Sequence, residues 1–116
     1  MFEMMDDYYA GPLTALVTCD RERRVLVAGA NASAITGWAE GDIIGQEIAG
    51  ALGLGFPDAP DDPIARSLEW GVRVLAQPCT FRPQRTDQDR PAVADIFPAY
   101  DDDGGLMLAL TPVTKG

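Results

Sequence analysis

The sequence contains no histidine at all. This absence excludes the Ser-His and Cys-His dyads of hydrolases, most zinc sites, and haem held through an imidazole ring. Long apolar runs are also missing, since no stretch approaches the ~20 residues that a helix needs to cross a bilayer. The first seven residues, MFEMMDD, carry acid where a signal peptide carries Lys or Arg. We therefore expect a cytoplasmic protein.

Positive charge is scarce. Nine basic residues stand against 18 acidic ones, which gives a formal net charge of −9. A nucleic-acid-binding protein needs a cationic face to displace counterions from phosphates, and an anionic membrane attracts clusters of Lys and Arg. The charge balance therefore predicts that the chain binds neither nucleic acid nor a membrane surface.

Cysteine is nearly absent, and Cys19 and Cys79 form no CxxC pair. Their number allows one disulfide. In a cytoplasmic chain, however, a reduced pair of small buried side chains is the usual state, and we expect that state here.

The pattern of the chain predicts one α+β domain, because 116 residues give room for a single modest core. A short amphipathic helix is expected over residues 2–10, before Gly11-Pro12. Strands are expected over residues 13–18, 25–28, 77–85, 92–100 and 106–111, with several helices between the second and the third. Residues 50–62, rich in Gly, Pro and Asp, are expected to be a flexible connection.

The best-defined helix begins at Asp62-Pro63, where an acidic N-cap precedes proline at the first helical position. Gly71 is a plausible end, although Val72 and Leu75 continue the apolar stripe of Ile64 and Leu68 and leave open an extension to Leu75. Pro83 lies inside the expected third strand and predicts an edge position for it, because proline donates no ladder hydrogen bond.

Residues 31–45, NASAITGWAEGDIIG, are the most informative stretch. A strand delivers Asn31 to a short helix that ends at Gly37-Trp38, and a second short helix ends at Gly45. LEWG at residues 68–71 and PAYDDDG at residues 98–104 follow in order. Together these segments resemble the PAS family.

The resemblance implies a five-stranded antiparallel sheet with short helices packed on one face. It assigns residues 1–12 to an N-terminal flanking helix and residues 13–114 to the PAS domain. It further implies a signalling module, such as the input part of a sensor kinase or transcription regulator in a two-component system, rather than an enzyme. An effector domain or a partner signalling protein is then expected as its target.

Two segments depart from the family pattern. Residues 86–89, TDQD, lack the Gly of the usual Lys/Arg-Asp-Gly turn, and Pro112 stands where many PAS domains carry the Asp of Asp-Ile-Thr. The second departure puts the usual output through a C-terminal helix in doubt. Because the sequence stops at Gly116, it is either an excised input domain or a small free-standing protein that acts in trans.

The family encloses an apolar cavity between the sheet and the helices. Matching Pro98 to the hairpin of the family, together with strand alternation, implies which side chains line it: Ile35, Ile44, Leu68, Trp70, Cys79, Phe81, Ala92, Ala94, Ile96, Leu108 and Leu110. Leu106 is expected on the same face of the sheet. The small Ala92 and Ala94 leave room either for a flat ligand or for a closely packed helix, and the packed core is the more frequent case.

No cofactor is required by the sequence, and its identity stays unknown. The helix motif of the flavin photoreceptors, Gly-x-Asn-Cys-Arg-Phe-Leu-Gln, does not occur, and no histidine is present for haem. A redox flavin near Trp38 or Trp70 and a haem held by Cys or Tyr remain alternatives. Arg66, Arg73 and Arg82, the cations nearest the cavity, suit a solvated surface better than a charged ligand.

The outer face of the sheet is the expected interface, since alternation turns Val93, Phe97, Met107 and Ala109 away from the core. We expect a homodimer, formed by this face and the N-terminal helix with Phe2, Met5 and Tyr9. Asp95 has no catalytic partner and is expected to be solvated. The acidic runs at residues 61–62 and 101–103 lack the spacing of a calcium loop, so neither a catalytic nor a metal site is predicted. Asn31 is expected to cap its helix.

Overall fold

A computed structural model describes residues 14–84, 86, 88–99 and 105–113. The strands are β1 (Ala15–Cys19), β2 (Val25–Ala28), β3 (Val74–Phe81), β4 (Arg90–Pro98) and β5 (Leu106–Pro112). Between β2 and β3 lie α2 (Ala30–Thr36), α3 (Glu40–Ile43), α4 (Ile48–Leu52) and α5 (Pro63–Trp70). The predicted order of two strands, several helices and three strands is confirmed. The helix expected over residues 2–10, and with it the flanking segment of residues 1–12, lies outside the described residues.

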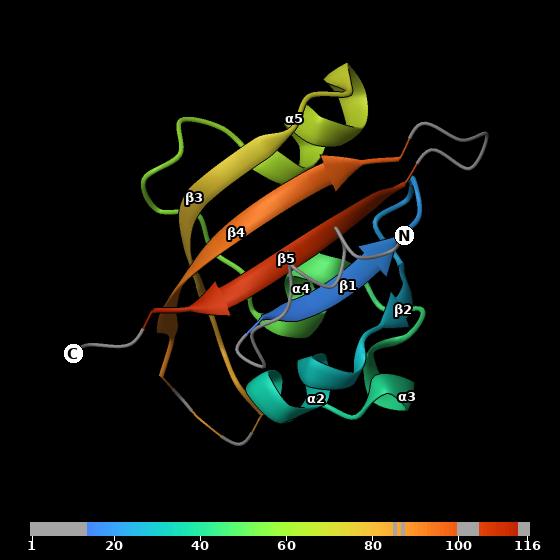
Figure 1. The fold of residues 1–116 in the computed structure, drawn as a ribbon, viewed down its shortest axis with the longest axis vertical. Helices are drawn as coiled ribbons and strands as arrows, with labels where there is room; N and C mark the ends of the chain where they lie inside the picture. The colour runs from blue at the N-terminus through green and yellow to red at the C-terminus, as the bar shows by residue number, and fades with distance from the viewer. Residues whose placement is uncertain (1–13, 85, 87, 100–104, 114–116) are drawn as a thin grey trace, which may run out of the picture.

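The five strands form one antiparallel sheet in the order β2-β1-β5-β4-β3. In Figure 1, α4 and α5 pass behind the strands, so one face of the sheet is turned toward helices. This arrangement confirms the α+β class and the five-stranded antiparallel sheet. The last strand, β5, runs between β1 and β4 and therefore joins the two halves of the chain.

The core lies between the sheet and the helices. Alternate residues of the strands point into it, as predicted, because successive side chains of a strand face opposite sides. The buried residues of this inner face are Ala15, Val17, Cys19, Cys79, Phe81, Ala92, Ala94, Ile96, Leu106, Leu108 and Leu110. The helices contribute Ile43, Ile48, Leu52 and Ile64, which are at most 2% exposed.

Both ends of α5 follow the sequence signals. The side chain of Asp62 accepts hydrogen bonds from the backbone N–H groups of Ile64 and Ala65, and Pro63 is the first helical residue. Gly71 ends the helix in the left-handed region with a φ of 66°. The possible extension to Leu75 is wrong, because β3 has already begun at Val74, which pairs with Ile96.

Two expectations about the helices are wrong. Gly29, with extended backbone, is the N-cap of α2, so Asn31 lies inside the first turn and caps nothing. Residues 50–52 belong to α4 rather than to a connection, since the Glu47 carboxylate accepts a hydrogen bond from Gly50 and holds the start of that helix.

Strand β3 is an edge strand, as predicted, but its bounds differ from residues 77–85. Pro83 lies beyond its end, and Pro78 lies inside it. A bulge between Val74 and Gln77 lets the strand begin earlier. In this bulge Ala76 adopts a φ of 54°, and its N–H donates to the carboxylate of Asp95 at 2.6 Å. Asp95 is therefore half-buried and hydrogen-bonded, not simply solvated.

Candidate interaction surface

The outer face of the sheet carries a row of side chains that crosses four strands. Thr18 of β1 pairs with Val27 of β2 on one side and with Met107 of β5 on the other, and Met107 pairs with Phe97 of β4. Residues paired directly across antiparallel strands share one face. We call Val27, Thr18, Met107 and Phe97 the outer row. It is uncharged, and Val27 is 54% exposed.

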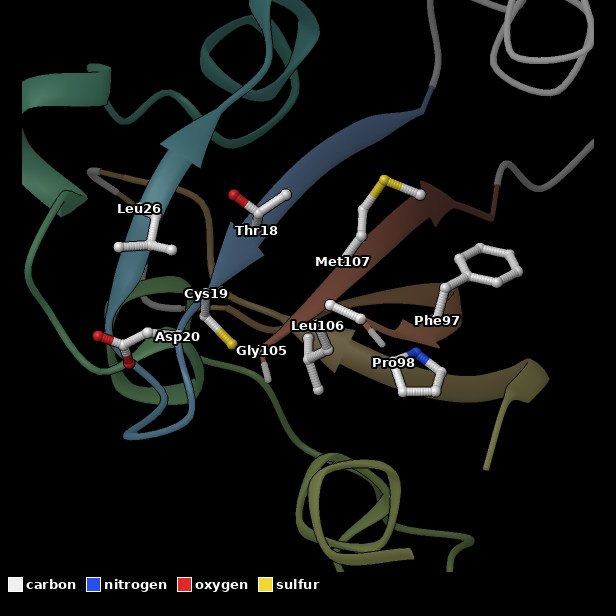
Figure 2. A pocket seen from close by; sticks show the side chains of 10 residues that line it. Thr18, Cys19, Asp20, Leu26, Phe97, Pro98, Gly105, Leu106 and Met107 are labelled. Atoms are coloured by element: carbon white, nitrogen blue, oxygen red, sulfur yellow. The ribbon is translucent and has the colours of Figure 1, made fainter. Parts of the chain in front are cut away.

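A pocket of about 380 Å³ opens next to this row. Figure 2 shows its lining, in which Thr18, Met107 and Phe97 stand on the neighbouring strands β1, β5 and β4. Leu26, which is 50% exposed, adds a fourth side chain from β2. The pocket and the outer row thus form one surface. The pocket lies where β1 and β4 end and β5 begins, and its lining also includes Asp20 and the inner-face residues Cys19 and Leu106.

Part of this surface was predicted from the sequence. Phe97 and Met107 were predicted there, and Val93 lies on the same face, half-buried in its pairing with Thr111. Ala109 also alternates outward, but it is only 1% exposed in the central strand. The predicted contributions of Phe2, Met5 and Tyr9 lie outside the described residues.

Leu26 and Thr18 were not predicted as part of the surface. The signal for Leu26 was available in the sequence, because Val25, Leu26, Val27 and Ala28 are all apolar. Alternation between core and surface breaks in β2, where Val25 and Ala28 are buried while Leu26 and Val27 are both exposed.

The expected cavity residues are mostly in the core. Cys79, Phe81, Ala92, Ala94, Ile96, Leu108 and Leu110 are buried, and Ile35 and Leu68 are half-buried against the same cluster. Two assignments are wrong. Ile44 follows the end of α3 and is 44% exposed, and Trp70, at the last residue of α5, is 74% exposed. Neither side chain can line an internal cavity.

Two polar atoms inside this region have no hydrogen-bond partner among the described residues. They are the hydroxyl of Ser67, whose residue is 0% exposed, and the indole nitrogen Nε1 of the half-buried Trp38. Ser67 lies on the buried face of α5, which contacts β4. A buried polar group without a partner is costly, so the site of Ser67 suits a water or a polar atom of a ligand.

The cysteines are buried and free, as predicted. Burial raises the pKa of Cys79 to about 11. It does the same for Cys19, because desolvation outweighs the hydrogen bond from the backbone of Leu106. Both thiols are therefore protonated at neutral pH and poor nucleophiles.

Several charged side chains form ion pairs with one another. The Arg23 guanidinium binds Glu47 at 2.9 Å and Asp62 at 2.7 Å, and Arg66 and Arg82 bind Asp61 and Asp89. Within the described ranges no group of three or more Cys, Asp or Glu side chains could hold a metal ion. None of the helices described here has the length and apolar character needed to span a bilayer.

No protein-family model and no curated protein matches the sequence. Solved structures do match. The PAS domain of nitrogen regulation protein NR(II) from Vibrio parahaemolyticus is 13% identical, with 87% of this chain and 90% of that chain covered at a TM-score of 0.68. The PAS domain of a protein from Colwellia psychrerythraea is 12% identical, with 98% and 100% covered at a TM-score of 0.71.

A Light-Oxygen-Voltage domain studied with a flavin analogue is 14% identical, with 99% of this chain and 88% of that chain covered at a TM-score of 0.68. Identities this low concern the fold alone. The element order, the sheet topology and these likenesses agree, and the chain has the PAS fold.

Proposed function

We propose that this chain is a non-catalytic signalling module that works by binding proteins, and that it forms a homodimer through the outer face of its sheet. The observation that carries this proposal is the outer row, an uncharged band of side chains with a pocket of about 380 Å³ beside it. Within this band Val27 is 54% exposed and Thr18 and Met107 are half-buried, and apolar surface within reach of solvent is typical of an interface. The fold, shared with a PAS domain of a nitrogen regulation protein, supports a regulatory role.

In this proposal the domain lies in the cytoplasm and receives a signal as the input part of a sensor kinase or a transcription regulator. It passes the signal to an effector domain or a partner protein through a change at the dimer contact. The net charge of −9 supports a protein partner rather than nucleic acid or an anionic membrane.

The test is a charge placed in the outer row. Met107→Glu puts a carboxylate where a dimer contact would exclude water, and we expect the dimer association constant to fall at least about tenfold, because an unpaired buried charge is strongly unfavourable. Ser33→Glu is the matched control, since Ser33 is exposed on α2 in the helical layer. Sedimentation equilibrium gives both constants. Equal association constants for Met107→Glu and the unchanged protein would refute the interface.

The role of the N-terminal segment is tested separately by deleting residues 1–10. If the segment contributes Phe2, Met5 and Tyr9 to the contact, the deletion weakens the dimer. An unchanged dimer would remove the segment from the proposal and leave the sheet face in place.

A second function is favoured by Ser67. Its unpartnered hydroxyl, together with the small Ala92 and Ala94 on the inner face, suits a small molecule with one polar atom held between α5 and the sheet. A sensor of this kind would carry its ligand through purification. The absorbance spectrum and native mass of the purified protein test it, and Ser67→Ala is expected to release any bound molecule.

A further inference from the structure

A pocket of about 290 Å³ opens where β4 begins and where β3, β5 and α2 end. We call it the rim pocket. Pro112, which lines it, lies opposite Ala92 in the pairing of β5 with β4, whereas the outer row crosses the same two strands at Met107 and Phe97. The rim pocket is therefore at the far end of these strands from the proposed dimer contact.

The walls of the rim pocket are mostly apolar and come from separate parts of the chain. They include Ile35 of α2, Phe81 at the end of β3, Pro83 just after it, and Pro112 at the end of β5. Phe81 is 1% exposed and belongs to the core, and the other three residues are half-buried. The fold itself holds these walls in place, which suits the apolar body of a small ligand.

Three polar side chains also line the rim pocket, and the first of them is already satisfied. The hydroxyl of Thr36 donates to the carbonyl of Ala32 at 2.7 Å and accepts from the N–H of Trp38 at 3.2 Å. The other two are the amide of Gln84 and the guanidinium of Arg90. Within the part of the chain that the structure describes, neither of these side chains makes a hydrogen bond or an ion pair. Both are free to donate to a ligand.

The charge of the rim pocket is positive in a chain whose net charge is −9. Among the described residues, Arg90 is the only charged side chain that lines it. Its backbone is fixed there, because Arg90 begins β4 and pairs with Phe81. Asp89, the next residue in the sequence, is already paired with Arg82 at 3.0 Å. The guanidinium of Arg90 therefore suits an anion, since its hydrogen bonds to a carboxylate are roughly twice as strong as neutral ones.

The surroundings select an anion with a single charge. One guanidinium balances one negative charge, and no second cation lines the pocket in the described residues. The carbonyl end of α2, at Thr36 and Gly37, also lies in the wall and carries partial negative charge. A doubly charged anion such as phosphate is disfavoured at this place, and a monocarboxylate is favoured.

We propose that the rim pocket binds a small apolar molecule with one carboxylate, such as an aromatic acid. The carboxylate accepts from the side chains of Arg90 and Gln84, and the apolar body packs against Ile35, Phe81 and Pro112. The site shares no residue with the outer row, and it is separate from Ser67 on the buried face of α5. It adds a ligand site to the functions proposed above and depends on neither of them.

The test uses benzoate as the probe and benzamide, a neutral molecule of nearly the same shape, as the matched ligand. Binding to the full chain is followed in ¹H–¹⁵N NMR spectra, because the backbone signals that shift also locate the site. We expect benzoate to bind with a dissociation constant of about 1 mM and to shift the signals of Gly37, Gln84 and Arg90. Benzamide is expected to bind at least about tenfold more weakly, because it lacks the charge.

Three variants separate the charge from the shape of the pocket. Arg90→Gln is expected to weaken benzoate at least about tenfold and to leave benzamide within about twofold. Arg73→Gln is the control, since Arg73 is also exposed, lies outside the pocket and gives the same change of net charge. It should leave benzoate binding unchanged. Ala34→Phe, which adds a ring to the wall from an exposed position of α2, is expected to weaken both ligands.

Urea unfolding confirms that each variant folds. No shifts up to about 20 mM benzoate, equal affinities for benzoate and benzamide, or unchanged binding by Arg90→Gln would overturn the proposal. Shifts confined to the outer row or to the surroundings of Ser67 would also overturn it, because they would place the ligand elsewhere. Met107→Glu should leave benzoate binding unchanged, so the dimer contact and the rim pocket can fail independently.

Discussion

At the scale of single residues, Asp62 joins three parts of the domain. One carboxylate oxygen, Oδ1, accepts from the N–H groups of Ile64 and Ala65 at 3.0 and 3.4 Å. The other, Oδ2, accepts from Arg23 at 2.7 Å. Arg23 also binds Glu47, the N-cap of α4. Two helix starts and the turn between β1 and β2 are thereby tied together.

Asp62 has a lowered pKa. Burial alone would raise it, but the Arg23 hydrogen bond and charge and the two backbone N–H groups outweigh burial. The ionised carboxylate therefore stabilises the fold above its ordinary pKa of 3.8, and this stability is lost as the pH falls through the lower folded value. Urea unfolding of Asp62→Asn should show a loss at pH 7 that shrinks as the pH falls below 3.8.

Asp62→Ala separates the cap from the ion pair. Asn still caps a helix, so Asp62→Asn loses only the ion pair, at a cost of about 0.5 kcal/mol for partly exposed groups. Ala removes the cap as well, and we expect a total loss of about 1.5 kcal/mol. Equal losses for the two variants would mean that the cap contributes nothing.

Gly53 and Gly71 form a matched pair at the ends of two helices, with φ of 63° and 66°. A Cβ at Gly53 would lie 2.7 Å from Cβ of Arg82 and 3.2 Å from its backbone nitrogen, whereas one at Gly71 meets nothing within 4 Å. Gly71→Ala should cost about 1 kcal/mol for the left-handed backbone alone. Gly53→Ala should cost about 3 kcal/mol, because the crowding adds to it. Similar unfolding free energies for both variants would contradict this reading.

At the scale of elements, the bulge of β3 stores strain at Ala76, whose φ of 54° is unusual for a residue with a Cβ. Ala76→Gly relieves that strain and should leave the unfolding free energy unchanged or raise it by up to about 1 kcal/mol. Ala34→Gly, at an exposed position of the helix α2, is the control and should cost about 1 kcal/mol. Equal losses at both positions would show that the bulge is unstrained.

The elements that the sequence predicts well are those with local signals. β2 matches residues 25–28, and both ends of α5 follow from Asp62-Pro63 and Gly71. The bounds of β3 could not be read, because its start depends on a bulge held by Asp95 from another strand. The predicted capping role of Asn31 is wrong for a related reason. The N-cap of α2 is Gly29, whose N–H donates a hydrogen bond to the carbonyl of Leu16 in β1, so a contact with another strand sets where the helix begins.

The candidate surface was predictable where strand alternation holds and not where it breaks. Phe97 and Met107 follow from alternation in β4 and β5. Leu26 was not predicted on the surface, because β2 exposes two successive residues and so breaks the alternation. Trp70 was predicted to line the cavity, but α5 ends at this residue and its side chain is exposed to solvent. The exposure of a side chain at the end of a helix or strand depends on the direction of the next element. The local periodicity of the sequence does not predict that direction.

At the scale of the whole molecule, the net charge of −9 opposes the approach of two copies. The outer row carries no charge of its own, so a dimer formed through it gains nothing from ion pairs in the contact. Its association constant should therefore rise with added salt, which screens the repulsion between the copies, and sedimentation equilibrium at low and high salt measures this change.

The two cysteines make the stability of the whole fold depend on alkaline pH. Desolvation raises the pKa of each thiol from 9.0 to about 11, so the folded state favours the protonated form. The contribution of each protonated thiol to the free energy of unfolding is fully present below pH 9.0. As the pH rises toward about 11 this contribution is lost, which lowers the stability by about 2 kcal/mol for each thiol.

Urea unfolding at several values between pH 8 and 11 should therefore show a steeper decline for the unchanged protein than for Cys79→Ala. Iodoacetamide at about pH 8 checks the same point, because it should not modify Cys79 until urea unfolds the chain. Rapid modification of Cys79 in the folded protein would mean that water reaches the inner face of the sheet, and the packed core between the sheet and its helices would then have to be open.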